Sequence, residues 1–460
     1  MSNPPTTPSP RRIAYDVLSA VRDSDAYANL LLPVRLERSG LSSADAGLTT
    51  ELTYGTLRMR GYYDAVIRLA AHREIDQIEP PVRDVLRLGA HQLLSMRVPS
   101  HAAVNETVRV AAQAIGRGRV GFVNGVLRGI ARTAPEKWRA RVQAEAADPD
   151  EAISELASHP VWIVRALRQA LAAERRPGAD PAAELEALLQ ADNAAPRVNL
   201  IALPGESALP DGAEPDAYSP YGFTLPGDPF PLLRASQGGL RVQDEGSQLA
   251  AIALVAARPV AAGERWLDLC AGPGGKAALL GAEARRAGAT LLANELVPVR
   301  VGLVRNAVAP LGDAVEVLEG DGRRIGAERP GEFDRVLLDA PCTGLGALRR
   351  RPEARWRKQP RDVAELTRLQ AALLDSAIAA LKPGGILAYV TCSPHLGETR
   401  IAVADALKRH PEELDELPTQ EILRGATRTP IDLAGDPAQV QLWPHRHGTD
   451  AMFIALLQRR

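Results

Sequence analysis

Residues 265–276, RWLDLCAGPGGK, decide the fold that we predict for this chain. The apolar start, 266–269, is typical of a short buried strand, and the glycine-rich turn leads into a helix-like segment rich in alanine and leucine, 277–287. Glycines let a ligand approach the backbone closely, and the first turn of a helix offers free N–H groups. The stretch therefore predicts a site for a nucleotide-like ligand between a strand and a helix.

Around this unit, strands and helices alternate from residue 243 to residue 460. The other expected strands are 290–294, 315–318, 335–338, 386–390, 439–442 and 452–457. The longest expected helix, 364–381, has apolar residues at helical spacing. Such alternation predicts an α/β fold with a mostly parallel sheet, which carries helices on both faces and binds ligands beyond the carboxyl ends of its strands.

The preceding part of the chain divides into segments of different composition. Residues 1–10, rich in proline, serine and threonine, predict a disordered tail. Residues 11–141 predict an all-helical domain, with helices expected at 12–21, 44–69, 81–96, 101–115 and 121–132. The alanine-rich, acidic stretch 142–150 predicts a linker. Residues 151–242 predict a small α/β subdomain, with strands at 196–200 and 239–242.

Composition narrows the class of protein. With 460 residues the chain is long enough for several domains, and a net charge of -1 excludes a globally polybasic protein. No apolar run has the length of a membrane helix and no signal peptide is evident, so we expect a cytoplasmic protein. Three dispersed cysteines predict neither a disulfide framework nor a zinc site, and we expect no metal.

A run of basic residues lies in the last third of the helical domain, between residues 109 and 141. A solvated helix surface and a phosphate-contacting patch both explain such a run. The sequence alone leaves these two interpretations open.

The glycine turn matches one nucleotide-binding pattern better than another. A Walker-type phosphate loop is excluded, because Cys270 stands where its first glycine should be and Ala277 where it needs serine or threonine. The dinucleotide pattern is matched by Gly272, Gly274 and Ala277, and Glu295 ends the next strand, where a ribose-hydroxyl acceptor is expected. A dinucleotide and an adenosyl ligand both fit this pattern.

Reactive side chains follow the other strands. Asp321 comes after the third strand, Asp339 and Cys342 after the fourth, and Cys392 after the fifth. Since the carboxyl ends of parallel strands share one edge of a sheet, we expect these groups to meet in one crevice. Two cysteines there could serve redox chemistry, metal binding or covalent catalysis, of which the last needs one thiolate and a second group to complete the cycle. Cys270 is expected to be structural.

Both halves of the chain resemble known families. The helical part is similar to the NusB-like RNA-binding domain at ELTYGTLR (51–58), LRLGAHQLL (86–94) and FVNGVLR (122–128). The second half resembles the NOL/NOP/Sun family of RNA 5-methylcytosine methyltransferases. Its matching motifs are DLCAGPGGK (268–276), DAPCTG (339–344), KPGG (382–385) and TCS (391–393), with QDEGSQ (243–248), RRPE (350–353), WR (356–357) and WPHR (443–446).

This resemblance implies a bacterial enzyme that methylates carbon 5 of a cytosine in 16S ribosomal RNA, with S-adenosylmethionine as cofactor and a seven-stranded, Rossmann-like sheet. Cys392 would add to carbon 6 of the base, Asp339 would hydrogen-bond the base, and Cys342 would assist proton removal and release. The cofactor would lie along Cys270, Ala271, Gly272, Pro273, Gly274, Gly275 and Lys276, with Glu295 at the ribose, Asp321 near the adenine and Asp339 near the methionine end.

Other implications concern the RNA and the family pattern. The arginines 349–351 would hold phosphates of small-subunit ribosomal RNA, and the protein is expected to be a monomer. Thr343 replaces the usual serine and Glu398-Thr399 the usual Glu-Asn, while Ala451 replaces a glycine and Glu295 a frequent aspartate. None of these departures removes a reacting group.

Three alternatives remain at the level of sequence. The same chemistry could act on another RNA. An NAD-dependent oxidoreductase could use the same glycine turn, but it would give Cys342 and Cys392 no role. The third alternative, a non-catalytic RNA-binding protein, is supported by the helical domain alone.

Overall fold

A computed structural model describes residues 9–24 and 26–460, so residues 1–8, most of the expected tail, lie outside the described part. Packing divides the chain into two compact units. The helical unit comprises the chain up to residue 165, together with 192–194 and 348–357. The sheet unit comprises 166–191, 195–347 and 358–460.

The helical unit contains the expected helices and three that were not expected, α2, α8 and α9. Its helices are α1 (Pro10–Asp23), α2 (Ala28–Glu37), α3 (Ser43–Arg58), α4 (Arg60–Ala71), α5 (Pro80–Leu94), α6 (Ser100–Ala114), α7 (Val120–Ala131), α8 (Pro135–Glu145) and α9 (Pro149–Ala157). Ser9 caps α1 and Pro10 is its first residue, as favoured at a helix start. The expected helix 44–69 is two helices, because Met59, with φ -100° and ψ 19°, leaves the helical conformation. Residues 142–150 include the end of α8 and the start of α9.

A short segment from the second half of the chain, 348–357, packs within the helical unit. Its Arg355 is fully buried. The guanidinium donates to the carbonyl oxygens of Arg58, Ser158 and Asp192 at 2.9, 3.1 and 2.8 Å, and to Asn193 Oδ1 at 2.7 Å. Trp356 lies so close to Gly61 that a Cβ atom there would come within 2.7 Å of the indole ring. The segment is therefore part of the core of this unit.

The sheet unit has the predicted mostly parallel sheet. Its strands are β5 (Arg265–Asp268), β6 (Thr290–Glu295), β7 (Val315–Glu319), β8 (Phe333–Asp339), β9 (Leu381–Thr391), β10 (Leu414–Glu416), β11 (Gln439–Gln441) and β12 (Phe453–Arg459). Seven of them follow the order β10-β12-β9-β8-β5-β6-β7, and β11 pairs with β12. The pairs among β5 to β9 are parallel and those of β12 are antiparallel.

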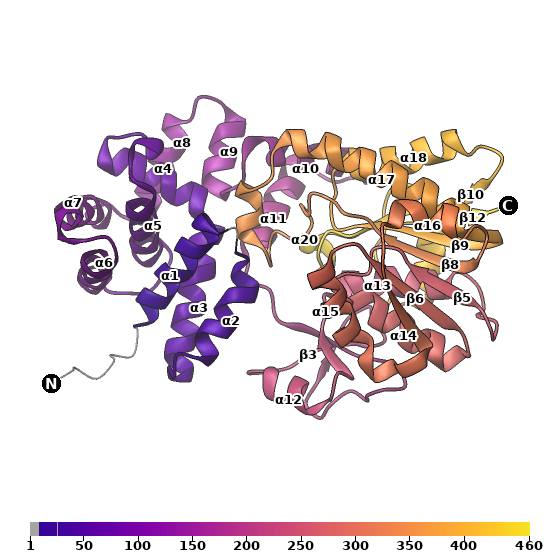
Figure 1. The fold of residues 1–460 in the computed structure, drawn as a ribbon. Helices are drawn as coiled ribbons and strands as arrows, with labels where there is room; N and C mark the ends of the chain where they lie inside the picture. Colours follow the sequence, from indigo (N-terminus) through magenta and orange to yellow (C-terminus); the bar gives the residue numbers. More distant parts are fainter. Residues whose placement is uncertain (1–8, 25) are drawn as a thin grey trace. The chain divides into compact units, whose positions relative to one another are not determined.

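Helices cover both faces of this sheet, as predicted (Figure 1). On one face α13 (Glu245–Ala256), α14 (Gly275–Ala287) and α15 (Pro298–Val308) share a core with Leu337 and Ala388. On the other face α16 (Gly322–Glu328), α17 (Pro360–Ala380) and α18 (Arg400–Arg409) share a core with Leu338 and Leu387. Because successive side chains of a strand point to opposite faces, β8 and β9 supply both cores.

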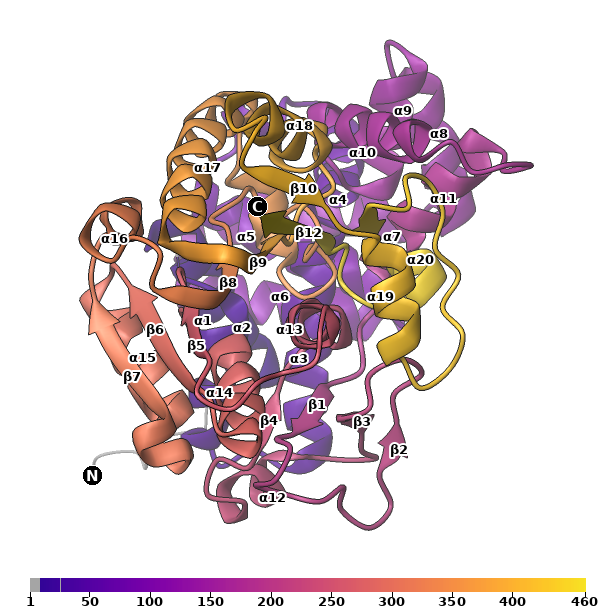
Figure 2. The ribbon, with the colours of Figure 1, turned by 90° about the vertical axis from the view of Figure 1, so that its right-hand side faces the viewer.

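A second, antiparallel sheet belongs to the expected small subdomain (Figure 2). It has the order β2-β3-β1-β4 and consists of β1 (Asn199–Ala202), β2 (Glu214–Pro215), β3 (Gly222–Thr224) and β4 (Leu240–Val242). Three further helices belong to this stretch: α10 (Val161–Glu174), α11 (Pro181–Asn193) and α12 (Phe230–Ala235). Among the described residues, none of the helices is both long and apolar enough to span a membrane.

Candidate active site

The glycine turn between β5 and α14 depends on two glycines for its shape. Gly272 donates its N–H to Glu295 Oε2 at 3.0 Å, and a Cβ atom at this position would lie 2.2 Å from the same oxygen. Gly274 has φ +107°, and its Cβ atom would lie 2.4 Å from that of Ala307. Side chains at either position would displace the turn, so only glycine allows the backbone to lie there.

Two expected ligand-binding carboxylates follow the neighbouring strands β6 and β7. Glu295 is buried and accepts the N–H groups of Gly272 and Val297. A carboxylate has about four acceptor positions, so Glu295 can still accept a hydroxyl group. Asp321 caps α16, and its pairing with Arg323 holds the pKa of Asp321 below its usual range.

The same end of the sheet contains buried acceptors that the sequence did not single out. Asp268, the last residue of β5, is fully buried, and burial raises its pKa to about 8, with the Asp339 carboxylate adding to the effect. Within the described chain, Asn294 Oδ1 has no hydrogen-bond partner, and the backbone N–H of Cys270 acts on the Asp268 carboxylate. Buried acceptors with unused capacity, beside a turn of free N–H groups, fit an adenosyl ligand that brings hydroxyl and ammonium donors.

Lys276 and Asp339 form an ion pair next to the turn. Lys276 lies in the first turn of α14 and Asp339 ends β8, and their Nζ and Oδ2 atoms are 2.8 Å apart. Burial lowers the pKa of Lys276, but the Asp339 carboxylate, together with Cys392 and Asp268, raises it overall. The lysine is therefore held as a cation at neutral pH.

The two thiols expected to meet do so. Cys342 follows β8 and Cys392 follows β9, two adjacent parallel strands, and their Sγ atoms are 3.5 Å apart. Hydrogen bonding between them lowers the pKa of Cys392, against the effect of burial, and Lys276 adds to the lowering. The same hydrogen bond and burial raise the pKa of Cys342. Either sulfur could donate in this contact, but the nearby Lys276 charge acts on Cys392 and favours Cys392 as the thiolate.

Cys270, expected to be structural, differs from this pair. It is a free cysteine, and burial together with the carboxylates of Asp268, Asp339 and Glu295 raises its pKa. A thiol held in its neutral form is a poor nucleophile.

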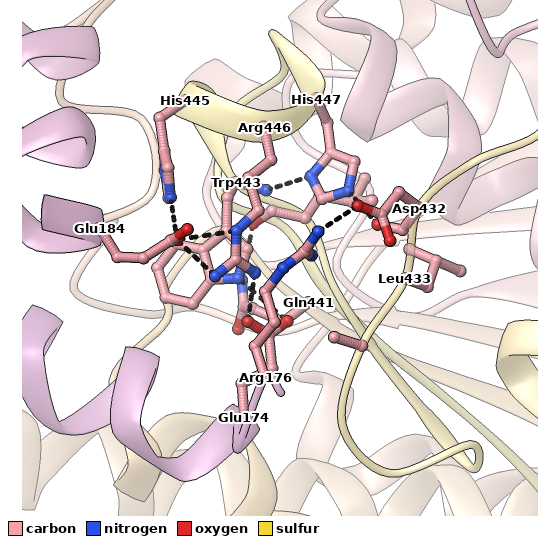
Figure 3. A network of polar contacts seen from close by, with 12 residues as sticks. Glu174, Arg176, Glu184, Asp432, Leu433, Gln441, Trp443, His445, Arg446 and His447 are labelled. Atoms are coloured by element: carbon pink, nitrogen blue, oxygen red, sulfur yellow. Dashed lines mark hydrogen bonds and ion pairs between the residues drawn. The ribbon is translucent and has the colours of Figure 1, made fainter. Parts of the chain in front are cut away.

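The 443–446 motif lies in a polar network with residues of α10 and α11 (Figure 3). Arg446 pairs with both Glu174 and Glu184. Trp443 donates its indole N–H to Glu174 at 3.2 Å, and His445 Nε2 lies 2.8 Å from Glu184. In this structure the motif therefore fixes the chain between β11 and β12.

That chain leads to the backbone of Cys392. Beyond the network, Ala451 donates its N–H to the carbonyl oxygen of Gly346 at 2.8 Å. Gly346 in turn donates its N–H to the carbonyl oxygen of Cys392 at 2.9 Å. A Cβ atom on Gly346 would lie 2.1 Å from the Ala451 oxygen, so this close approach requires glycine.

The parallel sheet with a glycine turn at one carboxyl edge defines a Rossmann-like fold, and the family match makes it that of an S-adenosylmethionine-dependent methyltransferase. Residues 256–458 match the family described as 16S rRNA methyltransferase RsmB/F, and residues 8–132 match the NusB family. The chain belongs to the RsmB/F family of RNA cytosine-5 methyltransferases with an N-terminal NusB domain.

Similar proteins extend over nearly the whole chain. The "Putative methyltransferase Rv1407" of Mycobacterium tuberculosis strain H37Rv is 49% identical over 98% of this chain and 96% of its own. The "Ribosomal RNA small subunit methyltransferase B" of Citrobacter koseri is 32% identical over 97% of this chain and 98% of its own. The crystal structure of PH0851, 22% identical, has the same fold, with a TM-score of 0.77 over 99% of both chains.

Family membership decides between the alternatives left by the sequence. The cofactor is S-adenosylmethionine and the substrate is RNA, so the oxidoreductase and the non-catalytic RNA-binding protein are excluded. When bound, the cofactor supplies an electrophilic methyl group.

Proposed function

We propose that this protein methylates carbon 5 of a cytosine in 16S ribosomal RNA. The description of the matching family supports this target, as does the name of the Citrobacter koseri relative. The observation that carries the chemistry is the pair of thiols 3.5 Å apart, beside the Lys276–Asp339 ion pair.

In the proposed reaction, each of the two cysteines has its own task. Cytosine carbon 5 is a weak nucleophile, so the Cys392 thiolate first adds to carbon 6 and makes carbon 5 electron-rich. Asp339 hydrogen-bonds the base and helps to protonate its ring nitrogen. After methylation, Cys342 gives up its own proton to solvent, and its thiolate takes the carbon 5 proton. The electron pair of that C–H bond re-forms the double bond between carbons 5 and 6, the bond between carbon 6 and the Cys392 sulfur breaks, and the ring nitrogen returns its proton to Asp339. The lowered pKa of Cys392 suits the nucleophile, and the raised pKa of Cys342 makes its thiolate the stronger base once it forms.

The proposed cofactor site consists of residues 270–276 with Glu295, Asp321 and Asp339. The unused buried acceptors Asn294 Oδ1 and the Asp268 carboxylate support this assignment, and Asp268 joins the candidate residues. Asp321 would have to share its carboxylate between Arg323 and the adenine.

The proposed RNA contacts include the helical domain, 11–141. Eight basic side chains of its last third are exposed: Arg109, Arg117, Arg119, Arg128, Arg132, Lys137, Arg139 and Arg141. Exposed arginine and lysine side chains suit phosphate contacts. The proposed division of the remaining chain is a linker at 142–150, a small subdomain at 151–242 and the methyltransferase domain at 243–460.

The decisive experiment uses labelled S-adenosylmethionine and unmodified small-subunit RNA, followed by mapping of 5-methylcytosine. Label at one cytosine of 16S RNA is the expected result for the unaltered protein. Cys392→Ala abolishes transfer, whereas Cys342→Ala leaves protein and RNA covalently joined. Methylation that survives Cys392→Ala contradicts the assignment of the nucleophile, and label in another RNA alone contradicts the target.

A further inference from the structure

Glu398 lies at the point where the loops of the two cysteines meet. It ends a short 3-10 turn, Leu396–Glu398, which follows β9, and its side chain is fully buried. Its own backbone is held by Tyr389, whose hydroxyl donates to the Glu398 carbonyl oxygen at 2.9 Å. The carboxylate is therefore presented from a fixed position.

Four hydrogen bonds end on this carboxylate. Oε1 accepts from the backbone N–H of Thr343 at 2.8 Å and from Gln370 Nε2 at 3.3 Å. Oε2 accepts from the hydroxyls of Thr343 at 2.5 Å and Ser393 at 2.7 Å. Gln370 also donates to the carbonyl oxygen of Pro341 at 2.9 Å.

These partners are the chain neighbours of the two thiols. Pro341 and Thr343 flank Cys342, and Ser393 follows Cys392. The Thr343 and Ser393 hydroxyl oxygens also lie 3.1 Å apart. One carboxylate thus ties together the two loops whose separation determines the distance between the sulfurs.

We propose that Glu398 is a positioning residue, which holds the Cys342 and Cys392 loops together so that the two thiols stay in hydrogen-bonding contact. This inference rests on the proposed function, because it gives the thiol pair a catalytic purpose. Glu398 itself acts only through Thr343 and Ser393. Hydrogen bonds to a buried charged group are stronger than those between neutral groups, which suits a carboxylate at this position.

The test compares graded changes at the two ends of the same contact. Glu398→Gln keeps the shape, and its amide can turn toward the two hydroxyls, so transfer falls about 10-fold. Glu398→Met removes all four acceptor contacts, and transfer falls about 100-fold. Thr343→Ser keeps the hydroxyl and serves as the matched control with nearly full activity. Thr343→Val removes the hydroxyl, so its transfer falls about 10-fold, as in Glu398→Gln.

A second readout needs neither RNA nor cofactor. The rate at which iodoacetamide alkylates Cys392 is followed by mass spectrometry as a function of pH. The charged and titratable groups acting on this thiol are Cys342, Asp339, Lys276 and Asp450. In Glu398→Gln, only the Cys342 contact loosens, so the alkylation profile moves to higher pH, while affinity for S-adenosylmethionine stays unchanged.

The outcomes separate this inference from the proposed function. A Glu398→Gln protein with the wild-type alkylation profile and wild-type transfer overturns the positioning role, as does a loss of transfer matched by an equal loss of cofactor binding. If Glu398→Met fails to fold, the transfer rates of Thr343→Val and Thr343→Ser still test the positioning role, and equal rates in these two variants overturn it. Methylation by Cys392→Ala contradicts the nucleophile assignment of the proposed function instead, and the alkylation profile of Glu398→Gln continues to test whether Glu398 holds the thiols together.

Discussion

Replacing Lys276 by methionine removes a charge while keeping most of the side-chain length. Its matched control is Lys382→Met, because Lys382 also pairs with an aspartate, Asp334, at 2.8 Å. The two lysines differ in exposure: the side chain of Lys276 is 10% exposed and that of Lys382 is 41% exposed. Only Lys276 lies beside the thiols.

The expected magnitudes follow from burial. Breaking a fully buried ion pair costs about 3–5 kcal/mol, and breaking an exposed pair costs about 0–1 kcal/mol. With Asp339 29% exposed, Lys276→Met should lower the free energy of unfolding by about 2 kcal/mol. Lys382→Met should lower it by about 0.5 kcal/mol.

Activity should separate the two variants more sharply. Without its lysine partner Asp339 loses its fixed orientation, and transfer should fall about 100-fold. Lys276 also helps to lower the pKa of Cys392, so the acid limb of the pH–rate profile should move to higher pH. Lys382→Met should keep the wild-type rate and profile.

Two measurements check these expectations. Urea unfolding gives the free energies, and single-turnover transfer from labelled S-adenosylmethionine, measured across the pH range, gives the profile. A Lys276→Met protein whose acid limb overlaps that of the wild type would refute the electrostatic part of the reasoning. Equal loss of activity in both variants would refute the special role of Lys276.

Two further predictions concern buried charges in the two units. The folded-state pKa of Asp268, about 8, lies above its ordinary value of 3.8, so its contribution to stability is complete at acid pH and is lost as pH rises toward 8. Urea unfolding at pH 5 and pH 8 should show the wild type losing stability relative to Asp268→Asn, and a pH-independent difference would contradict the raised pKa. Arg355→Met should destabilise the helical unit by about 3–5 kcal/mol, because three buried carbonyl oxygens and the half-buried Asn193 Oδ1 lose their donor. Arg361→Met, at an exposed position, is its control in thermal unfolding; equal melting temperatures would show that Arg355 contributes little.

The sheet and the meeting of the thiols could be predicted because they follow from chain order. Strand–helix alternation implies a parallel sheet, and parallel strands bring Asp339, Cys342 and Cys392 to one edge. The glycine turn was predictable for the same reason, since its glycines mark where backbone and neighbouring elements come close.

Other features depend on contacts between residues that are distant in sequence. Arg355 stands in an arginine-rich run that is typical of an exposed loop, yet it is fully buried. Glu398 was identified only as part of a family pattern, and its role could not be predicted because its four donors come from three separate segments. The strand β10, Leu414–Glu416, is too short for hydrophobic alternation to reveal it.

The ten residues 348–357 that complete the helical unit have a consequence for any attempt to divide this protein. A fragment ending at residue 165 would lack Arg355 and Trp356, and the carbonyl oxygens of Arg58 and Ser158 would lose their donor. The complementary fragment would carry a strongly basic peptide with a tryptophan and none of its packing partners. No single cut therefore separates the two halves cleanly, and gene fusion or fragment exchange within the family must transfer 348–357 together with the helices that enclose it.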